Sequence, residues 1–154
     1  MNFLYKTVEY KAVKKFTESL RPIIKCIDLN TCDCYVYNES NGTWFFEHNI
    51  INCDWFQSLI NNSAILTILN NTMNSESNEE LYLEVLRYMY DYNFINKLNV
   101  DTELVHTTDG IFNKTTRKTV PHSPLNYITS DKITNMSIYM YRICEGMNVF
   151  HFSE

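Results

Sequence analysis

The sequence predicts a small α/β protein of the α+β kind, in which a sheet of about three strands is flanked by helices and preceded by an N-terminal helix. Apolar residues recur at helical spacing near both ends of the chain and in its middle. Aromatic and β-branched residues flank a polar turn that contains Asn-Gly, which is typical of a hairpin. The chain has 154 residues and is 45% hydrophobic, which suits one domain with its own core.

Residues 6–20 are expected to form an amphipathic helix, because Val8, Ala12, Phe16 and Leu20 follow one another at four-residue steps, with Val13 beside them. Lysines occupy the opposite face. A solvated helix face explains them more simply than an acidic partner or a membrane surface. Pro22 restricts continuation of the helix. We therefore predict that residues 1–24 form a helix packed on the domain that follows.

The sheet is predicted from three segments. Residues 25–37 and 43–47 are the two strands of the hairpin, joined by the turn at residues 38–42. A short helix over residues 52–60 follows, capped by Asn52 or Asp54. The apolar stretch 64–69 is short enough for a third strand.

The clearest helix is predicted at about residues 78–92, opened by the capping box of Ser77 and Glu80. Its inward stripe is Tyr82, Val85, Leu86 and Met89. Phe94, Ile95 and Leu98 then suggest extended chain.

Residues 101–127 are polar and are interpreted as an insertion or long loop that has room for a hairpin. A last helix is predicted over residues 131–145, with Ile133, Met136, Met140, Ile143 and Met147 at helical spacing and Gly146 as its stop. Residues 25–154 are thus expected to be a single domain.

Charge and composition narrow the function classes. The net charge is −5, from 13 basic and 18 acidic residues, and the basic residues form no dense run, which disfavours nucleic acid as a partner. The N-terminus lacks the pattern of a secretory signal, and the apolar runs are too short for a membrane span. A cytoplasmic or nuclear protein is therefore expected. Abundant Asn, Ile and Tyr with only 3 Gly and 3 Pro suggests an AT-rich genome such as that of a large DNA virus, in which case the compartment is the host cell cytoplasm.

The five cysteines are interpreted as reduced thiols, because their number is odd. A zinc site remains open, although the spacing lacks the usual Cys pairs and buried thiols are the more frequent explanation. The residues concerned are Cys26, Cys32, Cys34, Cys53 and His48. No cofactor is predicted.

No catalytic motif is evident. His106 with Asp109, or His122 with Cys144, could pair as base and nucleophile in a small hydrolase or nuclease, but nothing in their sequence context requires this. The three glycines do not form a phosphate-binding loop. We therefore expect a protein that is not an enzyme.

The order of the elements resembles the BTB/POZ fold, in particular its elongin C-like and Skp-like branch. Trp44-Phe-Phe-Glu-His48 occupies the place of that family's hairpin motif, and Asp54-Trp-Phe-Gln-Ser-Leu59 that of its next helix. Glu84-Val-Leu-Arg-Tyr-Met-Tyr90 matches its aromatic-rich helix end, and residues 138–147 its closing helix. The resemblance covers about residues 30–98 and 128–150. It departs from the family in the Cys32-Asp-Cys-Tyr-Val36 strand, the extra N-terminal helix and the long 101–127 connection.

The resemblance implies a non-enzymatic protein–protein interaction module, an adaptor that joins a cullin-type ubiquitin ligase scaffold to a target, or a viral host-modulating protein. Independently, the tyrosines outnumber what a core of this size can bury, and Tyr88 and Tyr92 share a second face of the 78–92 helix; packing beneath residues 101–127 is the alternative explanation. The predicted partner-binding residues are Tyr88, Tyr92, Phe94, Tyr139 and Tyr141. A homodimer is left open. The alternative function is a structural subunit of a virion or multisubunit polymerase.

Overall fold

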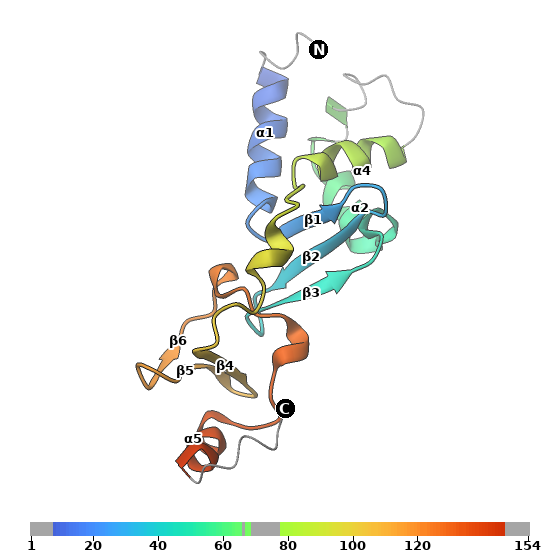
Figure 1. Cartoon of the computed structure of the whole chain (residues 1–154). Helices are drawn as coiled ribbons and strands as arrows, with labels where there is room; N and C mark the ends of the chain where they lie inside the picture. Colours follow the sequence, from blue (N-terminus) through green and yellow to red (C-terminus); the bar gives the residue numbers. More distant parts are fainter. Residues whose placement is uncertain (1–7, 66, 69–77, 147–154) are drawn as a thin grey trace. The chain divides into compact units, whose positions relative to one another are not determined.

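The computed structural model describes residues 8–65, 67–68 and 78–146 (Figure 1). This part of the chain contains α helices and two three-stranded sheets, so the mixed α+β class is confirmed. The chain divides into two compact units. The first comprises Met1–Val36 and Phe46–Ile95, and the second comprises Tyr37–Phe45 and Asn96–Glu154. The predicted domain 25–154 is therefore distributed over both.

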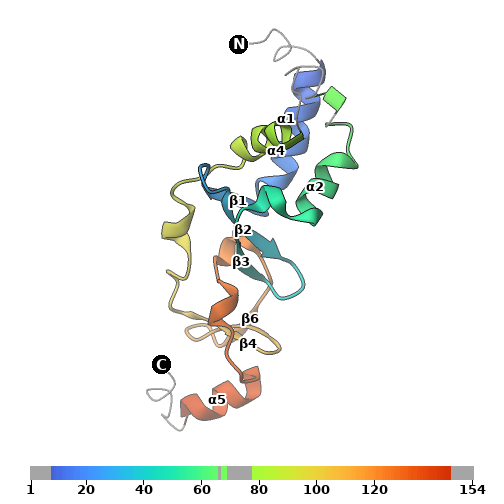
Figure 2. The same ribbon diagram turned by 90° about the vertical axis from the view of Figure 1, so that its right-hand side faces the viewer.

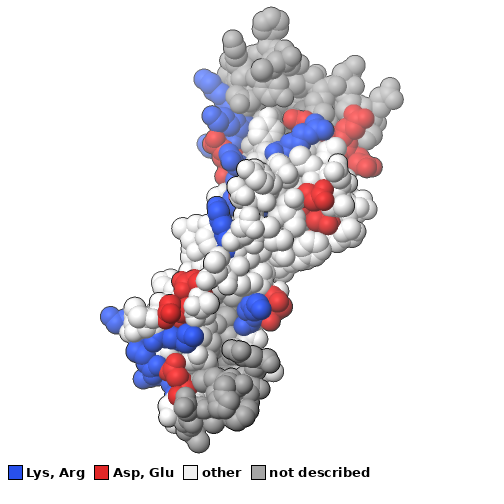
Figure 3. Space-filling model, viewed as in Figure 1, with Lys and Arg blue, Asp and Glu red and all other residues white. Residues whose placement is uncertain are grey.

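The first unit begins with α1 (Val8–Leu20), and residues 6 and 7 of the predicted helix lie outside the described residues. The predicted apolar residues Val13 and Leu20 are buried, whereas Ala12 and Phe16 are only half-buried, and Thr17 is buried in addition. The Thr17 hydroxyl tolerates burial because it donates to the Val13 carbonyl at 2.9 Å. Figure 3 shows basic atoms along α1, where Lys11, Lys14 and Lys15 are exposed as expected.

The first sheet has the order β1-β2-β3, with β1 (Ile24–Asp28), β2 (Asp33–Asn38) and β3 (Thr43–Glu47). The prediction of one strand over residues 25–37 is wrong, because a turn divides it into β1 and β2. The Asp28 carboxylate accepts the Asn30 and Thr31 amides at 2.8 and 3.3 Å, and Cys32 takes a φ of 59°. An Asx turn of this kind competes with the strand for its backbone groups.

Two helices lie beside these strands in both views (Figures 1 and 2): α2 (Asp54–Asn61), which follows the 3-10 helix η2 (Ile50–Asn52), and α4 (Asn78–Arg87). The predicted stripe of α4 is confirmed as buried. The core of the unit is completed by apolar side chains of the sheet, η2 and α2: Ile24, Cys26, Cys34, Val36, Ile50, Phe56 and Ile60.

Three predictions for this unit are corrected. Residues 64–69 are not a strand, because the described residues Ile65, Thr67 and Ile68 are helical; Leu66 and Leu69 lie outside the described residues, as does Ser77 of the capping box. A short apolar run fits either structure. The predicted helix 78–92 ends at Arg87, and the segment predicted as extended contains the 3-10 helix η3 (Phe94–Lys97).

The second unit contains the hairpin turn and a second sheet, β4 (Leu104–Thr107), β5 (Gly110–Asn113) and β6 (Lys118–Val120), in that order. Both pairings are antiparallel, with Thr107 opposite Gly110 and Asn113 opposite Lys118. The polar stretch 101–127 is thus a three-stranded meander rather than a long loop. Its centre is apolar, since Ile111 and Phe112 are buried.

The chain continues through the 3-10 helices η4 (Pro124–Asn126) and η5 (Ser130–Lys132) to α5 (Ile138–Gly146). The helix predicted from residue 131 begins seven residues later in the chain, because the Asp109 carboxylate accepts the Ile138 amide at 2.8 Å and caps it there. The predicted stripe is wrong as well. Tyr141 is the buried residue of α5, while Met140 and Ile143 are exposed, and Met147 lies outside the described residues.

Candidate functional site

The predicted partner-binding residues divide into exposed and buried side chains. Tyr92 and Tyr139 are 69% and 71% exposed, and Tyr88 is half-buried. Phe94 and Tyr141 are 0% and 8% exposed, so the structure corrects their assignment to a surface. Tyr88 and Tyr92 do not share a helix face either, because α4 ends before both of them.

Three of the six exposed large apolar residues among the described residues of the first unit lie in the stretch that follows α4, and the other three are Phe46, Trp55 and Leu59. Tyr90, Tyr92 and Ile95 are 44%, 69% and 50% exposed, and the Tyr90 and Tyr92 rings lie 6.5 Å apart. We name residues 90–95 the tyrosine segment. Scattered exposed apolar residues are normal on any protein, but three in six positions, two with rings in contact, form a patch.

The backbone of the tyrosine segment is fixed to the edge of the first sheet. Cys26 of β1 donates its amide to Met89 O at 2.9 Å and accepts the Asp91 amide at 2.9 Å, which makes a parallel bridge between Cys26 and Tyr90. The Phe94 ring is buried 6.0 Å from that of Tyr35, which in turn lies 5.5 Å from the ring of Phe46. Phe94 therefore anchors the segment from below, while its neighbours Tyr92 and Ile95 face outward.

In the second unit, α5 presents one exposed tyrosine and buries the other. Tyr141 packs with its ring 6.2 Å from that of Phe112, and burial, followed by the charge of Glu145, raises the pKa of its hydroxyl. Arg117 and Glu145 form an ion pair next to it. Tyr139 lies on the open side of the helix beside the exposed Met140.

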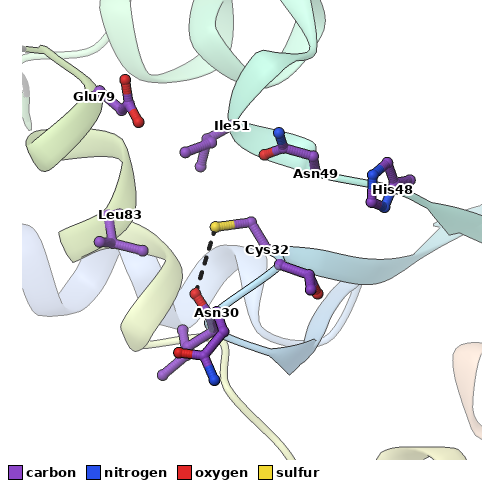
Figure 4. A pocket seen from close by; sticks show the side chains of 9 residues that line it. Asn30, Cys32, His48, Asn49, Ile51, Glu79 and Leu83 are labelled. Atoms are coloured by element: carbon purple, nitrogen blue, oxygen red, sulfur yellow. Dashed lines mark hydrogen bonds between the residues drawn. The ribbon is translucent and has the colours of Figure 1, made fainter.

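A pocket of about 400 Å³ opens in the first unit between the β1–β2 turn, the end of β3, η2 and α4 (Figure 4). Apolar lining comes from Leu29, Ile51 and Leu83, with the sulfur of Cys32 at the centre. Polar groups line the remainder: Asn30, Thr31, His48, Asn49 and Glu79. This mixture supplies apolar contact and hydrogen-bonding groups in one place.

The wall of the pocket contains two residues in the left-handed region, Cys32 with φ 59° and Asn49 with φ 48°. The Ile50 amide donates to Cys32 O at 2.9 Å, and the Asn49 amide donates to the Asp33 carboxylate at 3.1 Å. Positive φ in non-glycine residues persists only where surrounding contacts hold it. The loop after β3 is thus held against the β1–β2 turn.

Cys32, His48 and Asp33 are residue types that can form a nucleophilic triad, but their arrangement here is different. His48 Nδ1 lies 2.5 Å from Asp33 Oδ1, whereas the Cys32 thiol points away from His48 and donates to Leu29 O at 3.6 Å (Figure 4). Burial raises the pKa of Cys32, so its thiolate is disfavoured. Although burial opposes it, hydrogen bonds from Asn49, Thr31 and His48 lower the pKa of Asp33. The Asp33 carboxylate therefore stabilises the loop after β3, and it does not orient His48 toward the Cys32 thiol.

The structure brings together His106 and His122, the two histidines of the hydrolase hypothesis. Their rings stack with centroids 6.1 Å apart. His106 is buried, however, with Nδ1 2.9 Å from Thr107 O and Nε2 against the carbonyl oxygen of Asn41. Asp109 accepts the Thr107 hydroxyl and caps α5 instead of facing His106. Both ring nitrogens of His106 thus lie against backbone carbonyls, and the contact with Asn41 ties β4 to the hairpin turn.

All five cysteines are free thiols, with Cys26, Cys32 and Cys34 buried. Among the described residues, no group of three or more His, Cys, Asp or Glu side chains is placed to hold a metal ion. None of the described helices is long and apolar enough to cross a membrane.

Comparison of the chain with models of known protein families and with curated proteins gives no match. The function must therefore be argued from the two features described above, the tyrosine segment and the pocket. The sequence prediction named Tyr92 but missed Tyr90 and Ile95, and it missed the pocket. The available signal for the pocket was the Asp28-Leu-Asn-Thr31 turn, of which Leu29, Asn30 and Thr31 line it.

Proposed function

We propose that this chain is a non-enzymatic protein–protein interaction module and that the tyrosine segment binds its partner. The observation that carries the proposal is the exposure of Tyr90, Tyr92 and Ile95 on a backbone that is fixed by hydrogen bonds. Tyrosine is enriched at interfaces because it buries a large area with few rotatable bonds and keeps a hydroxyl for the rim.

Anchoring favours this role, because a surface that is already ordered loses less conformational entropy on binding. The Cys26 bridge and the buried Phe94 ring order the segment without help from a partner. A flexible tail with the same side chains would bind more weakly for an equal buried area.

The partner's chemistry follows from the segment. Asp91 is half-buried within it, and no cation belongs to residues 90–95. A partner with an apolar helix face or loop that carries basic residues at its rim would complement this surface. The resemblance to elongin C-like proteins makes an adaptor for a cullin-type ligase, in a viral or cellular setting, the specific form of the proposal that we put forward.

The experiment is affinity capture of the tagged full chain from its native or host cells, read by quantitative mass spectrometry. The test variant is Tyr90→Ala/Tyr92→Ala. Tyr139→Ala in α5 is the comparison variant, because Tyr139 is a predicted partner-binding residue outside the tyrosine segment and is 71% exposed, against 69% for Tyr92. Circular dichroism and urea unfolding establish that both variants fold.

We expect a stoichiometric partner whose recovery falls about tenfold or more in the segment variant and is unchanged in Tyr139→Ala. If that partner is a cullin-type scaffold, the adaptor form is supported. Recovery of only sister subunits of one particle or polymerase would favour the structural alternative. Equal recovery with the folded segment variant, or loss only with Tyr139→Ala, would refute the assignment of the interface to residues 90–95.

A further inference from the structure

Three thiols that the proposed function does not use lie at one end of the β1–β2 hairpin. Cys26 and Cys34 are both fully buried and stand directly opposite each other in the antiparallel register. Cys32 follows the turn, outside β2, and faces the pocket (Figure 4). The opposed positions of Cys26 and Cys34 in the ladder determine which pair of thiols can react.

Cys26 and Cys34 form a non-hydrogen-bonded pair of the ladder. The Cys26 amide donates to Met89 O and the Cys26 carbonyl accepts the Asp91 amide on the other side of β1, so both groups point away from Cys34. In an antiparallel pair of this type the two Cα atoms approach to about 4.5 Å, the shorter of the two spacings. That spacing lies within the range that a disulfide spans.

The two side chains also act on each other directly, because each is the leading cause of the shift in the other's pKa. The Cys34 thiol donates toward Cys32 O at 3.7 Å. Cys32 is different, since its thiol is turned to Leu29 O, 3.6 Å away, and its backbone leaves the strand with a φ of 59°. Of the three thiols, only Cys26 and Cys34 combine opposed positions, a matching spacing and mutual contact.

We propose that Cys26 and Cys34 are a redox-active dithiol that closes to a cross-strand disulfide on exposure to hydrogen peroxide. The first step is attack of the Cys26 sulfur on a peroxide oxygen, which breaks the O–O bond, leaves a sulfenic acid on Cys26 and releases one water. The Cys34 thiol then attacks that sulfur, the S–O bond breaks, and the second oxygen leaves as water. The two thiols together lose two protons and two electrons, and one hydrogen peroxide becomes two waters.

The roles of the two sulfurs follow from their environments. The hydrogen bond with Cys34 lowers the pKa of Cys26 against the opposing effect of burial. The same hydrogen bond, together with burial, raises the pKa of Cys34. The thiolate is the reactive form of cysteine, so Cys26 reacts first and Cys34 resolves the sulfenic acid.

The disulfide would act on the pocket. The loop that it closes contains Leu29–Cys32, the turn that forms one wall. A cross-link across so short a loop removes open conformations of this turn. Oxidation should therefore rigidify the pocket wall, and a thiol reductant should reverse the effect.

The test is a disulfide map of the folded full chain after treatment with hydrogen peroxide, with free thiols alkylated before digestion. Cleavage before Asp and after Glu separates the relevant sulfurs. Cys26 lies before Asp28, Cys32 lies between Asp28 and Asp33, and Cys34 is parted from Cys53 by Glu39 and Glu47. The expected product is a reducible Cys26–Cys34 peptide pair about 2 Da lighter than the two thiol peptides.

Cys32→Ser is the matched control, because it removes a neighbouring buried thiol and should retain the linkage, whereas Cys34→Ser should abolish it. Amide exchange gives an independent readout on the unaltered sequence, and the Leu29–Cys32 turn should exchange about tenfold more slowly after oxidation. Full alkylation of Cys26 and Cys34 after treatment, or linkage of either to Cys32 in place of the other, would overturn the proposal.

Discussion

Phe94 separates a structural role from a binding role within the tyrosine segment. The sequence places Phe94 and Tyr92 together as partner-binding residues, but the structure buries the first completely and exposes 69% of the second. Substitution of each by alanine should therefore affect the free energy of unfolding differently. Phe94→Ala should destabilise the protein, and Tyr92→Ala should leave its stability nearly unchanged.

The magnitude follows from the contacts. Removing a fully buried phenylalanine side chain costs about 3–5 kcal/mol, of which the ring contact with Tyr35, at 6.0 Å, accounts for about 0.5–1.5 kcal/mol. Since a native domain is stable by about 5–15 kcal/mol, Phe94→Ala will be close to unfolding. Phe94→Leu, which keeps most of the volume, should cost about 1–1.5 kcal/mol. Tyr92→Ala should stay within about 0.5 kcal/mol of the unaltered protein.

Urea unfolding followed by far-UV circular dichroism measures these differences. Hydrogen exchange localises the loss of stability. The amides of Cys26 and Asp91 donate the two hydrogen bonds of the bridge that Phe94 supports, so their exchange rates report on it. Both amides should exchange faster in Phe94→Leu and normally in Tyr92→Ala. The reasoning fails if Phe94→Leu is as stable as the unaltered protein, or if Tyr92→Ala loses more free energy of unfolding than Phe94→Leu.

Three further predictions concern other parts of the chain. Gly42 has a φ of +74°, and a Cβ there would lie 2.7 Å from His122 Cγ, so Gly42→Ala should lower the free energy of unfolding by about 1–3 kcal/mol. In a double-mutant cycle, adding His122→Ala should recover the cost of the steric clash but not the cost of the positive φ. Trp44, 1% exposed, donates through Nε1 to Pro124 O at 2.9 Å, so Trp44→Phe should lose about 1–3 kcal/mol in urea unfolding. The lowered pKa of Asp33 implies a stabilisation that is complete above the unfolded value of about 4 and is lost as the pH falls through the folded value. Asp33→Asn should therefore be less stable at pH 7, and the difference should shrink below about pH 4; a constant difference would contradict the assignment.

Local signals predicted the elements whose causes are local. The Asn-Gly turn forms because Gly42 can take a positive φ, and the inward stripe of α4 follows from its apolar spacing. The Asx turn of Asp28 was also readable, because Asp-Leu-Asn-Thr is a turn sequence inside an otherwise apolar run. Without this turn, the sequence prediction gave one long strand over residues 25–37 and did not place the turn residues at a pocket.

Long-range hydrogen bonds decided the elements that the sequence could not predict. The start of α5 depends on Asp109, which is 29 positions away from the Ile138 amide that it accepts. The burial of His106 depends on Asn41, 65 positions away. Neither contact is identifiable from spacing, because each joins a residue of the second sheet or its β4–β5 turn to a residue far away in the chain.

The tyrosine segment illustrates how one such bond changes the inferred binding surface. A helix that continued to residue 92 would place Tyr88 and Tyr92 on one face, because residues four apart are neighbours on a helix. Instead, Cys26 on the edge strand β1 forms hydrogen bonds with Met89 O and with the Asp91 amide. These bonds hold Tyr90 in a parallel bridge with Cys26. Tyr90 is the bridge residue and Tyr92 lies in the turn that follows it, so Tyr90 replaces Tyr88 as the neighbour of Tyr92, and their rings lie 6.5 Å apart. The residue types that favour binding were visible in the sequence, but the pair that acts together depends on a single backbone bridge.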